Sequence, residues 1–323
     1  MLGGIFMFKR LLFSNFIKYV AITMAVLCLP WIVTLSFGQN KTQYIYNTKE
    51  SGRYVRLDEG KVDVEDFTAY ILSRQMDIST EEEALKAQAV IIRTHLYKMM
   101  DEENKSILDG NNTEFAYYTY KELEKLWGDD FTLKFNKLMK VVSATSMEVI
   151  TYNDKVIKPY YHWSSSGNTR DGQSVLGKEY GYLKSVQSSR DVEAKEYLQG
   201  VVVEKKEFVR KLREFNNEVS ISDEAPLETL QIVERCSGGY ISSVQIGNVM
   251  ISGDEFAYIY SLASPNFQVD EYDGNVRIVT KGSGHGLGLS MYGAMQLAKN
   301  GKSYQEILNH YYTDVKIAKV GTK

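Results

Sequence analysis

The chain has 323 residues, of which 44% are hydrophobic, so it is long enough to bury a substantial core and too apolar for a disordered protein. It carries 38 basic and 41 acidic side chains, and the first 38 residues hold three of the bases and no acid, so the remainder is mildly acidic. That balance argues against nucleic acid as a partner, because phosphate binding requires a basic footprint.

The N-terminal segment predicts a membrane anchor. Residues 19–37 form an uncharged apolar run that is long enough to span a bilayer and follows three bases. A signal-peptide core usually has about 7–15 residues, so we favour an uncleaved anchor, although residues 36–38 offer a weak cleavage site. The bases keep residues 1–18 in the cytoplasm, and we expect a single-pass protein of the cell membrane whose C-terminal part is extracytoplasmic.

The two cysteines limit the chemistry of the exported part. Cys28 lies within the apolar run, which leaves Cys236 alone in the rest of the chain. A disulfide framework and a cysteine-based zinc site are therefore excluded, and we expect no metal and no cofactor. We expect Cys236 to be a small buried residue.

After a linker over residues 38–60, the sequence predicts helices. The stretch Val62–Met76 continues into a strong helix, for which Thr80-Glu81-Glu82-Glu83 provides a capping box and acids in the first turn. We expect a further helix from Lys121 through Val149. A hairpin should follow up to Ile157, with Asn153-Asp154 as its turn.

The rest of the chain predicts loops and short strands. Residues 160–200 are polar and loop-rich, a kind of segment that is often functional. Residues 203–217 predict a charged helix, and strands are expected over 229–233, 240–246 and 274–280. The fold class is therefore α+β, with one domain over residues 61–315 and a short tail over 316–323.

The most informative segment is Lys281–Ala294, which places His285 between Gly284 and Gly286 just before a helix. The glycines give the backbone conformational freedom and have no side chains that would shield His285 from solvent. Apolar residues then follow at helical spacing until Asn300-Gly301, so the glycines precede a helix N-terminus whose free N–H groups can bind an anion or a sugar oxygen. The spacing alone leaves open whether His285 is a site residue or a hydrogen-bonded structural residue.

Four segments in the same order resemble motifs of the SpoIID/LytB family, which includes the stage II sporulation protein D and amidase-enhancer proteins. They cover about residues 60–315 and comprise Val64–Met76 with Glu83–Ala89 and Arg93, Tyr161–Thr169 with Tyr182–Val186 and Asp191, Ser252–Phe256, and Lys281–Ala294 with Ser303–Tyr312. The resemblance implies a SpoIID-like extracytoplasmic domain with a glycan-binding cleft. It also implies lytic transglycosylase chemistry, in which one carboxyl group acts as acid and then as base, during engulfment of the forespore.

One departure from the family pattern bears directly on activity. The family's catalytic glutamate falls where this chain has Gln75, and an amide cannot transfer the proton. The sequence therefore predicts a pseudoenzyme that binds glycan strands with lost or much reduced activity. Two alternatives stay open: an active transglycosylase with a displaced carboxylate, Asp77 or one of Glu81–Glu83, and an amidase-activating protein.

The resemblance also assigns residues to the site. Gln75, Arg93, His162 and His285 occupy the catalytic positions, and we expect all four to face one cleft, with Arg93 pairing an acidic group or a substrate oxygen. The expected substrate-binding residues are Tyr160, Tyr161, Ser164, Ser165, Ser166, Thr169, Gly284, Gly286, Ser290 and Tyr292. Trp163 replaces a small residue of the family motif, which should narrow the groove. The expected partners are peptidoglycan glycan strands, other cell-wall hydrolases and the membrane, through the N-terminal helix.

Overall fold

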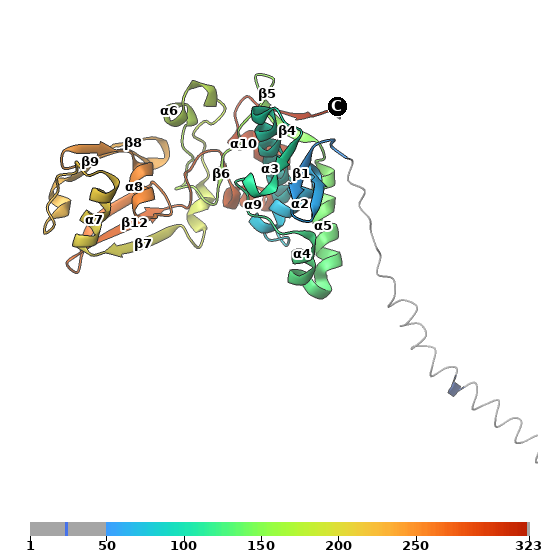
Figure 1. Ribbon diagram of the computed structural model, residues 1–323, viewed down its shortest axis with the longest axis horizontal. Coiled ribbons are helices and arrows are strands. Elements are labelled where there is room, and N and C mark those ends of the chain that lie inside the picture. Colours follow the sequence, from blue (N-terminus) through green and yellow to red (C-terminus); the bar gives the residue numbers. More distant parts are fainter. Residues whose placement is uncertain (1–22, 25–49, 322–323) are drawn as a thin grey trace, which may run out of the picture. The chain divides into compact units, whose positions relative to one another are not determined.

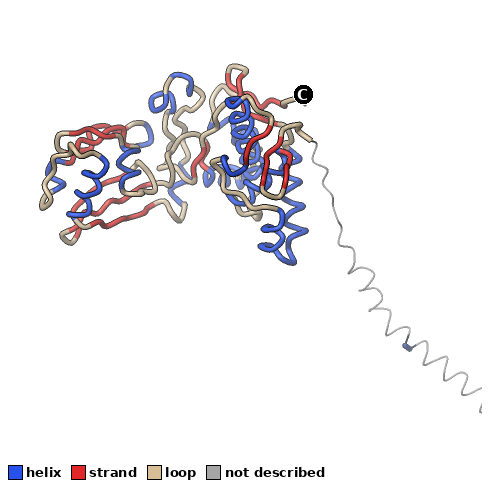
Figure 2. The backbone as a smooth tube through the Cα atoms, viewed as in Figure 1, coloured by secondary structure: helices blue, strands red, loops and turns tan. Residues whose placement is uncertain are grey.

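Two hydrophobic cores organise the described part of the chain. The computed structural model describes residues 23–24 and 50–321, and its mixture of helices and short strands confirms the α+β class (Figures 1 and 2). Apart from residues 23 and 24, the anchor expected over 19–37 lies outside the described residues. Among the residues that are described, no helix has the length and apolarity needed to span a bilayer.

The first core is built around the long helix α3 (Glu82–Glu103), which contacts α2, α5, α9, α10 and β4 (Figure 1). Its remaining elements are β1 (Tyr54–Leu57), β2 (Gly60–Asp63), α2 (Val64–Gln75), β3 (Ile107–Asp109), α4 (Tyr120–Trp127), α5 (Phe131–Ala144), β4 (Glu148–Tyr152) and β5 (Lys155–Val156). Strand β1 pairs antiparallel with β2 and parallel with β3. The N-cap Asp63 accepts the N–H of Glu65 and so fixes the start of α2 directly after β2.

Two expectations for the helices are wrong in detail. The helix expected from Lys121 through Val149 is divided, because Gly128 adopts φ +49° at the end of α4 and α5 begins only at Phe131. The capping box at Thr80 does not form: α3 starts at Glu82 with Glu81 as an N-cap that makes no side-chain bond. The hydroxyl of Thr80 instead contacts the sulfur of Met295 at 3.9 Å.

The hairpin expected up to Ile157 is confirmed. Strands β4 and β5 pair antiparallel, and both turn residues, Asn153 and Asp154, have positive φ, as a two-residue type I′ turn requires. Strand β14 (Lys316–Lys319), in the segment expected to be a tail, pairs with the other edge of β4. The C-terminal residues thereby close the same small sheet.

The second core lies within residues 208–278. Its elements are β7 (Leu198–Val203), α7 (Lys205–Phe215), β8 (Leu230–Arg235), β9 (Ile241–Ile246), β10 (Val249–Ile251), α8 (Gly253–Ile259), β11 (Phe267–Tyr272) and β12 (Asn275–Lys281). Their strands form two three-stranded sheets, β10-β9-β8 and β11-β12-β7. Helix α7 corresponds to the expected charged helix, and β8, β9 and β12 correspond to the three expected strands. Cys236, expected to be buried, is a free and partly exposed cysteine between β8 and β9.

A two-stranded parallel pair joins the middle of the chain to its C-terminal part. Strand β6 (Tyr161–His162) pairs with β13 (Leu289–Ser290), and helices α9 (Met291–Lys299) and α10 (Tyr304–Tyr311) follow directly. Ser290 caps α9 by accepting the N–H of Gly293. This pairing brings the serine-rich segment and the glycine-rich segment together.

A fully buried ion pair ties the helices of the first core to one another. Arg93 of α3 donates to both carboxylate oxygens of Glu65 in α2, at 2.8 and 2.7 Å, and neither side chain is exposed. Its remaining N–H groups bond to Thr145 and to the carbonyls of Val142 and Glu148. A desolvated pair of this kind is costly to break, since removal of one partner leaves a buried unpaired charge.

We therefore expect Arg93→Met to lower the free energy of unfolding by about 3–5 kcal/mol, because Glu65 stays buried without its cation. Replacing both residues together, in Glu65→Leu/Arg93→Met, should recover much of that loss. The matched control is Lys121→Met, which removes an exposed ion pair with Glu59 and should cost less than about 1 kcal/mol. Urea unfolding measures all three variants, and equal losses for Arg93→Met and Lys121→Met would contradict the assignment.

Candidate functional site

A cavity of about 320 Å³ opens beside β6 and the glycine-rich segment. Its lining residues come from α3, from the loop that precedes α4, from the segment leading into β6 and from the glycine-rich segment; they are His95, Glu114, Phe115, Lys158, Pro159, Tyr160, Tyr161 and His285. Three of the residues expected to form the site, Tyr160, Tyr161 and His285, are among them. The cavity is both aromatic and polar, a combination typical of small-molecule and sugar sites.

Gln75 lies against this cavity through Tyr161. At the end of α2, its amide nitrogen donates to the Tyr161 hydroxyl at 2.7 Å, and its amide oxygen accepts from Gln88 of α3 at 2.8 Å. Burial raises the pKa of Tyr161 to about 12, so this hydroxyl keeps its proton. A carboxylate in place of the Gln75 amide would keep the hydrogen bond from Gln88, and it would accept a second one from Tyr161 after rotation of that hydroxyl group.

His162 is a neutral, buried imidazole. Its Nδ1 lies 3.1 Å from the carbonyl oxygen of Leu287, which can only accept, so Nδ1 carries the proton. Burial, and secondarily the neighbouring His285, lower the pKa of His162 to about 3. Its Nε2 is buried without a hydrogen-bond partner among the described residues.

His285 is the second neutral imidazole, and its ring centroid lies 5.8 Å from that of His162. Its Nδ1 accepts the N–H of Leu287 at 3.0 Å, which leaves the proton on Nε2. Burial and then the positive charge of Arg170 lower the pKa of His285 to about 4. At neutral pH neither histidine is a cationic acid, although each can make hydrogen bonds.

Two of the glycines expected to bind substrate are required for close packing. Gly284 and Gly286 have φ of +107° and +79°. A Cβ on Gly284 would lie 2.6 Å from the Cβ of His162, and one on Gly286 would lie 2.3 Å from the Tyr240 ring. Side chains are therefore excluded at both positions by strain and by contact.

The start of α9 is already occupied by the protein's own groups. Ser290 is fully buried and accepts the N–H of Gly293, and the N–H of Tyr292 donates to the Trp163 carbonyl at 2.9 Å. The expected free N–H groups are thus not available at these two positions. Tyr292 is half-buried, and its ring packs edge-on to Trp163 at 6.5 Å.

The polar residues that follow Trp163 mostly stabilise the loop. Ser164, Ser165 and Thr169 are fully buried. The N–H of Ser165 donates to Asp191 at 2.7 Å, and the Thr169 hydroxyl donates to the carbonyl of Lys184. Burial corrects the expectation that these three side chains face a sugar. Ser166 is half-buried, and its hydroxyl donates to the carbonyl of Gly238.

Arg93 is not part of the cavity. It pairs with an acidic group, as one of its two expected roles required, but that group is the buried Glu65 and the side chain is fully enclosed. Of the four residues expected to face one cleft, His285 lines this cavity and Gln75 contacts it through Tyr161, whereas His162 and Arg93 are buried and do not line it. The apolar surroundings of Arg93 in the sequence signalled burial, and a buried arginine needs a carboxylate partner.

The sequence reasoning missed Glu114 and His95. The Glu114 carboxylate lies 3.7 Å from Nε2 of His95, with Glu114 63% exposed and His95 nearly buried. Burial lowers the pKa of His95, and the charge of Glu114 opposes that shift. The position of His95 could have been inferred from the sequence, because it follows Gln88 by two helical turns and so lies on the same face of α3.

The carboxylates considered as replacements for the family's catalytic glutamate do not line the cavity. The side chain of Asp77 accepts the N–H of Ser79, and Glu82 pairs with Lys140. Hydrogen bonds from Ser79 lower the pKa of Asp77, and one from Lys140 lowers that of Glu82. Glu83 pairs with Lys86. Neither these three residues nor Glu81 lines the cavity, whereas Glu114 does.

Comparison with known proteins gives one family. The family model of the stage II sporulation protein, SpoIID, matches residues 58–152. The stage II sporulation protein D of Bacillus amyloliquefaciens is 29% identical over 263 residues, 80% of this chain and 74% of that protein. The protein of the same name from Bacillus subtilis is 24% identical over 336 residues, covering 93% and 96%. An uncharacterised protein of Brachyspira hyodysenteriae is 30% identical over 265 residues, covering 80% and 67%.

The lowered pKa of His162 predicts acid sensitivity. Its folded pKa of about 3 lies below its ordinary value of 6.5, so the unfolded chain takes up the proton first. The contribution to stability is fully present above pH 6.5 and is lost as the pH falls toward 3. By pH 5 the loss is about 2 kcal/mol. Urea unfolding at several pH values should show a shallower acid dependence for His162→Asn. The partly exposed control His310→Asn should keep the slope, and an unchanged slope in His162→Asn would refute the assignment.

Proposed function

Because the chain belongs to the SpoIID family of sporulation proteins, we propose that it binds peptidoglycan glycan strands with lost or much reduced lytic transglycosylase activity. One observation carries the proposal: Gln75 occupies a position with two hydrogen-bonding neighbours suited to a carboxylate, yet it presents an amide. General acid catalysis contributes typically about 10²–10⁴-fold, and departure of a poor sugar leaving group depends on it.

The remaining cavity supports binding. Tyr160 and Tyr161 offer aromatic surface, and the neutral His285 lies edge-on to Tyr160 at 5.6 Å. Aromatic faces pack against pyranose rings while nearby polar atoms fix their orientation. The apolar run over residues 19–37 supports a position at the membrane, with the binding domain on its outer side.

A second candidate is an active transglycosylase that uses Glu114. Glu114 is the carboxylate among the residues that line the cavity, and it lies beside the imidazole of His95. Its side chain is 63% exposed, whereas the general acid of a glycosidase typically lies in an apolar pocket. We therefore rank this candidate below the binding protein.

We expect Gln75→Glu to raise glycan cleavage by on the order of 10²–10⁴-fold, with little change in glycan affinity. The change is nearly isosteric, and Tyr161 and Gln88 can both donate to the new carboxylate. Mass spectrometry of anhydro ends released from purified glycan strands measures cleavage, and co-sedimentation with insoluble peptidoglycan measures binding. Adding Tyr161→Phe to the variant should remove part of the gain.

The same assays separate the alternatives. If the unaltered full-length chain already cleaves and Glu114→Gln abolishes cleavage, Glu114 is the acid and the leading proposal fails. If the Gln75→Glu variant binds glycan but does not cleave it, the site is not arranged for a carboxylate at this position. Failure of the unaltered chain to sediment with peptidoglycan would reject glycan binding and favour a partner-activating protein.

A further inference from the structure

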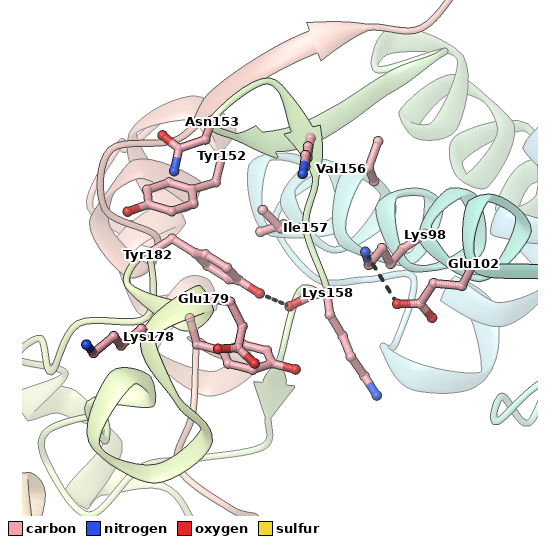
Figure 3. Close-up of a pocket in the computed structure, with 12 residues that line it drawn as sticks. Lys98, Glu102, Tyr152, Asn153, Val156, Ile157, Lys158, Lys178, Glu179 and Tyr182 are labelled. Carbon is pink, nitrogen blue, oxygen red and sulfur yellow. Dashed lines mark hydrogen bonds and ion pairs between the residues drawn. The ribbon is translucent and has the colours of Figure 1, made fainter.

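A second, larger cavity of about 520 Å³ lies next to the candidate site (Figure 3). Its lining residues come from α3, from the β4–β5 hairpin with the segment that follows it, and from the loop near residue 180; they are Lys98, Glu102, Tyr152, Asn153, Lys155, Val156, Ile157, Lys158, Lys178, Glu179, Tyr180 and Tyr182. Lys158 lines both cavities, so the two are neighbours at that residue.

The charge of this cavity is positive. Four lysines and two glutamates line it, and Lys98 is paired with Glu102 at 3.3 Å. Lys155, Lys158 and Lys178 make no ion pair with any residue in the described part of the chain. Figure 3 shows Lys158 and Lys178 on opposite sides of Glu179. Lys158 lies over the Tyr160 ring, 5.5 Å from its centroid. Lysines at a concave surface that have no carboxylate partner among the described residues are available to an external anion.

Aromatic rings connect this cavity to the first one. The Tyr152 and Tyr182 ring centroids lie 5.4 Å apart, those of Tyr182 and Tyr180 6.1 Å, and those of Tyr180 and Tyr160 5.9 Å. Tyr160 in turn contacts His285. The Tyr182 hydroxyl donates to the Lys158 carbonyl at 2.9 Å, which fixes the backbone that carries that lysine.

We propose that the lysine and tyrosine cavity is a subsite for carboxylates carried by the glycan strand that occupies the first cavity. This inference rests on the proposed glycan binding. A strand that passes the partly exposed rings of Tyr160 and Tyr180 would place pyranose rings against aromatic surface. Its acidic substituents would then lie near Lys155, Lys158 and Lys178. Charge-assisted hydrogen bonds from lysine to carboxylate then add affinity that an uncharged glycan cannot obtain.

The carboxylate has two sources in peptidoglycan, and the chemistry of recognition is the same for both. One is the lactyl carboxylate of N-acetylmuramic acid, which is free on strands without stem peptides. The other is the set of carboxylates on the stem peptide itself. Strands of each kind therefore form separate arms of the test.

The experiment compares binding of three labelled probes by the purified full-length chain, using fluorescence anisotropy at low and high salt. The probes are uncharged N-acetylglucosamine oligomers, glycan oligomers without peptides, and glycan oligomers that keep their stem peptides. Lys155→Gln/Lys178→Gln, which changes no residue that lines the first cavity, should weaken binding of one or both acidic probes by roughly five- to twentyfold at low salt and leave binding of the uncharged probe unaffected. The acidic probe that responds identifies the source of the carboxylate.

The matched control is Lys206→Gln/Lys299→Gln, which removes the same charge from two exposed lysines outside both cavities and should change nothing. Equal weakening by the two double variants, or none by either, overturns the subsite while glycan binding stands. Failure of the unaltered chain to bind any of the probes would instead reject the proposed function. Thermal unfolding confirms that each variant is folded.

Discussion

The buried pair between Glu65 and Arg93 determines where the helices of the first core lie. Because all the guanidinium nitrogens bond within the core, α2 and α3 are held in one register and α5 and β4 are joined to them. That register places Gln75, at the end of α2, within reach of Gln88 in α3. The position of the amide is thus set by an ion pair that never contacts a ligand.

The backbone of a single residue, Leu287, orients the two histidines. The carbonyl of Leu287 accepts from His162, and its N–H donates to His285, so each imidazole has one defined tautomer. Both rings are held neutral by burial, which suits them to hydrogen bonding and makes them poor proton donors at neutral pH. A general acid at this site would therefore have to be a carboxyl group, and Gln75 provides an amide instead.

Sequence reasoning predicted those features that depend on local chemistry. The β4–β5 hairpin followed from its Asn153-Asp154 turn, and α9 followed from its glycine-rich start and its stop at Asn300. The resemblance to the family motifs predicted that Tyr161, His162 and His285 lie close together. It could not show that Ser164 and Ser165 point inward, because hydroxyl groups serve backbone bonds and ligands equally well. Nor could it detect the cavity role of Glu114, which depends on a contact with α3 across the fold.

The strand pair between β6 and β13 has a consequence for how the protein acquires its structure. His162 and Leu287 are 125 residues apart in sequence, and the whole second core lies between them. Closing so long a loop is slow, because the chain entropy is lost before the contact is gained. The first cavity is therefore completed only after residues 285–290 have been synthesised and docked. Until then β6 has an unpaired edge, which exposes the unfinished chain to non-native strand pairing at this point.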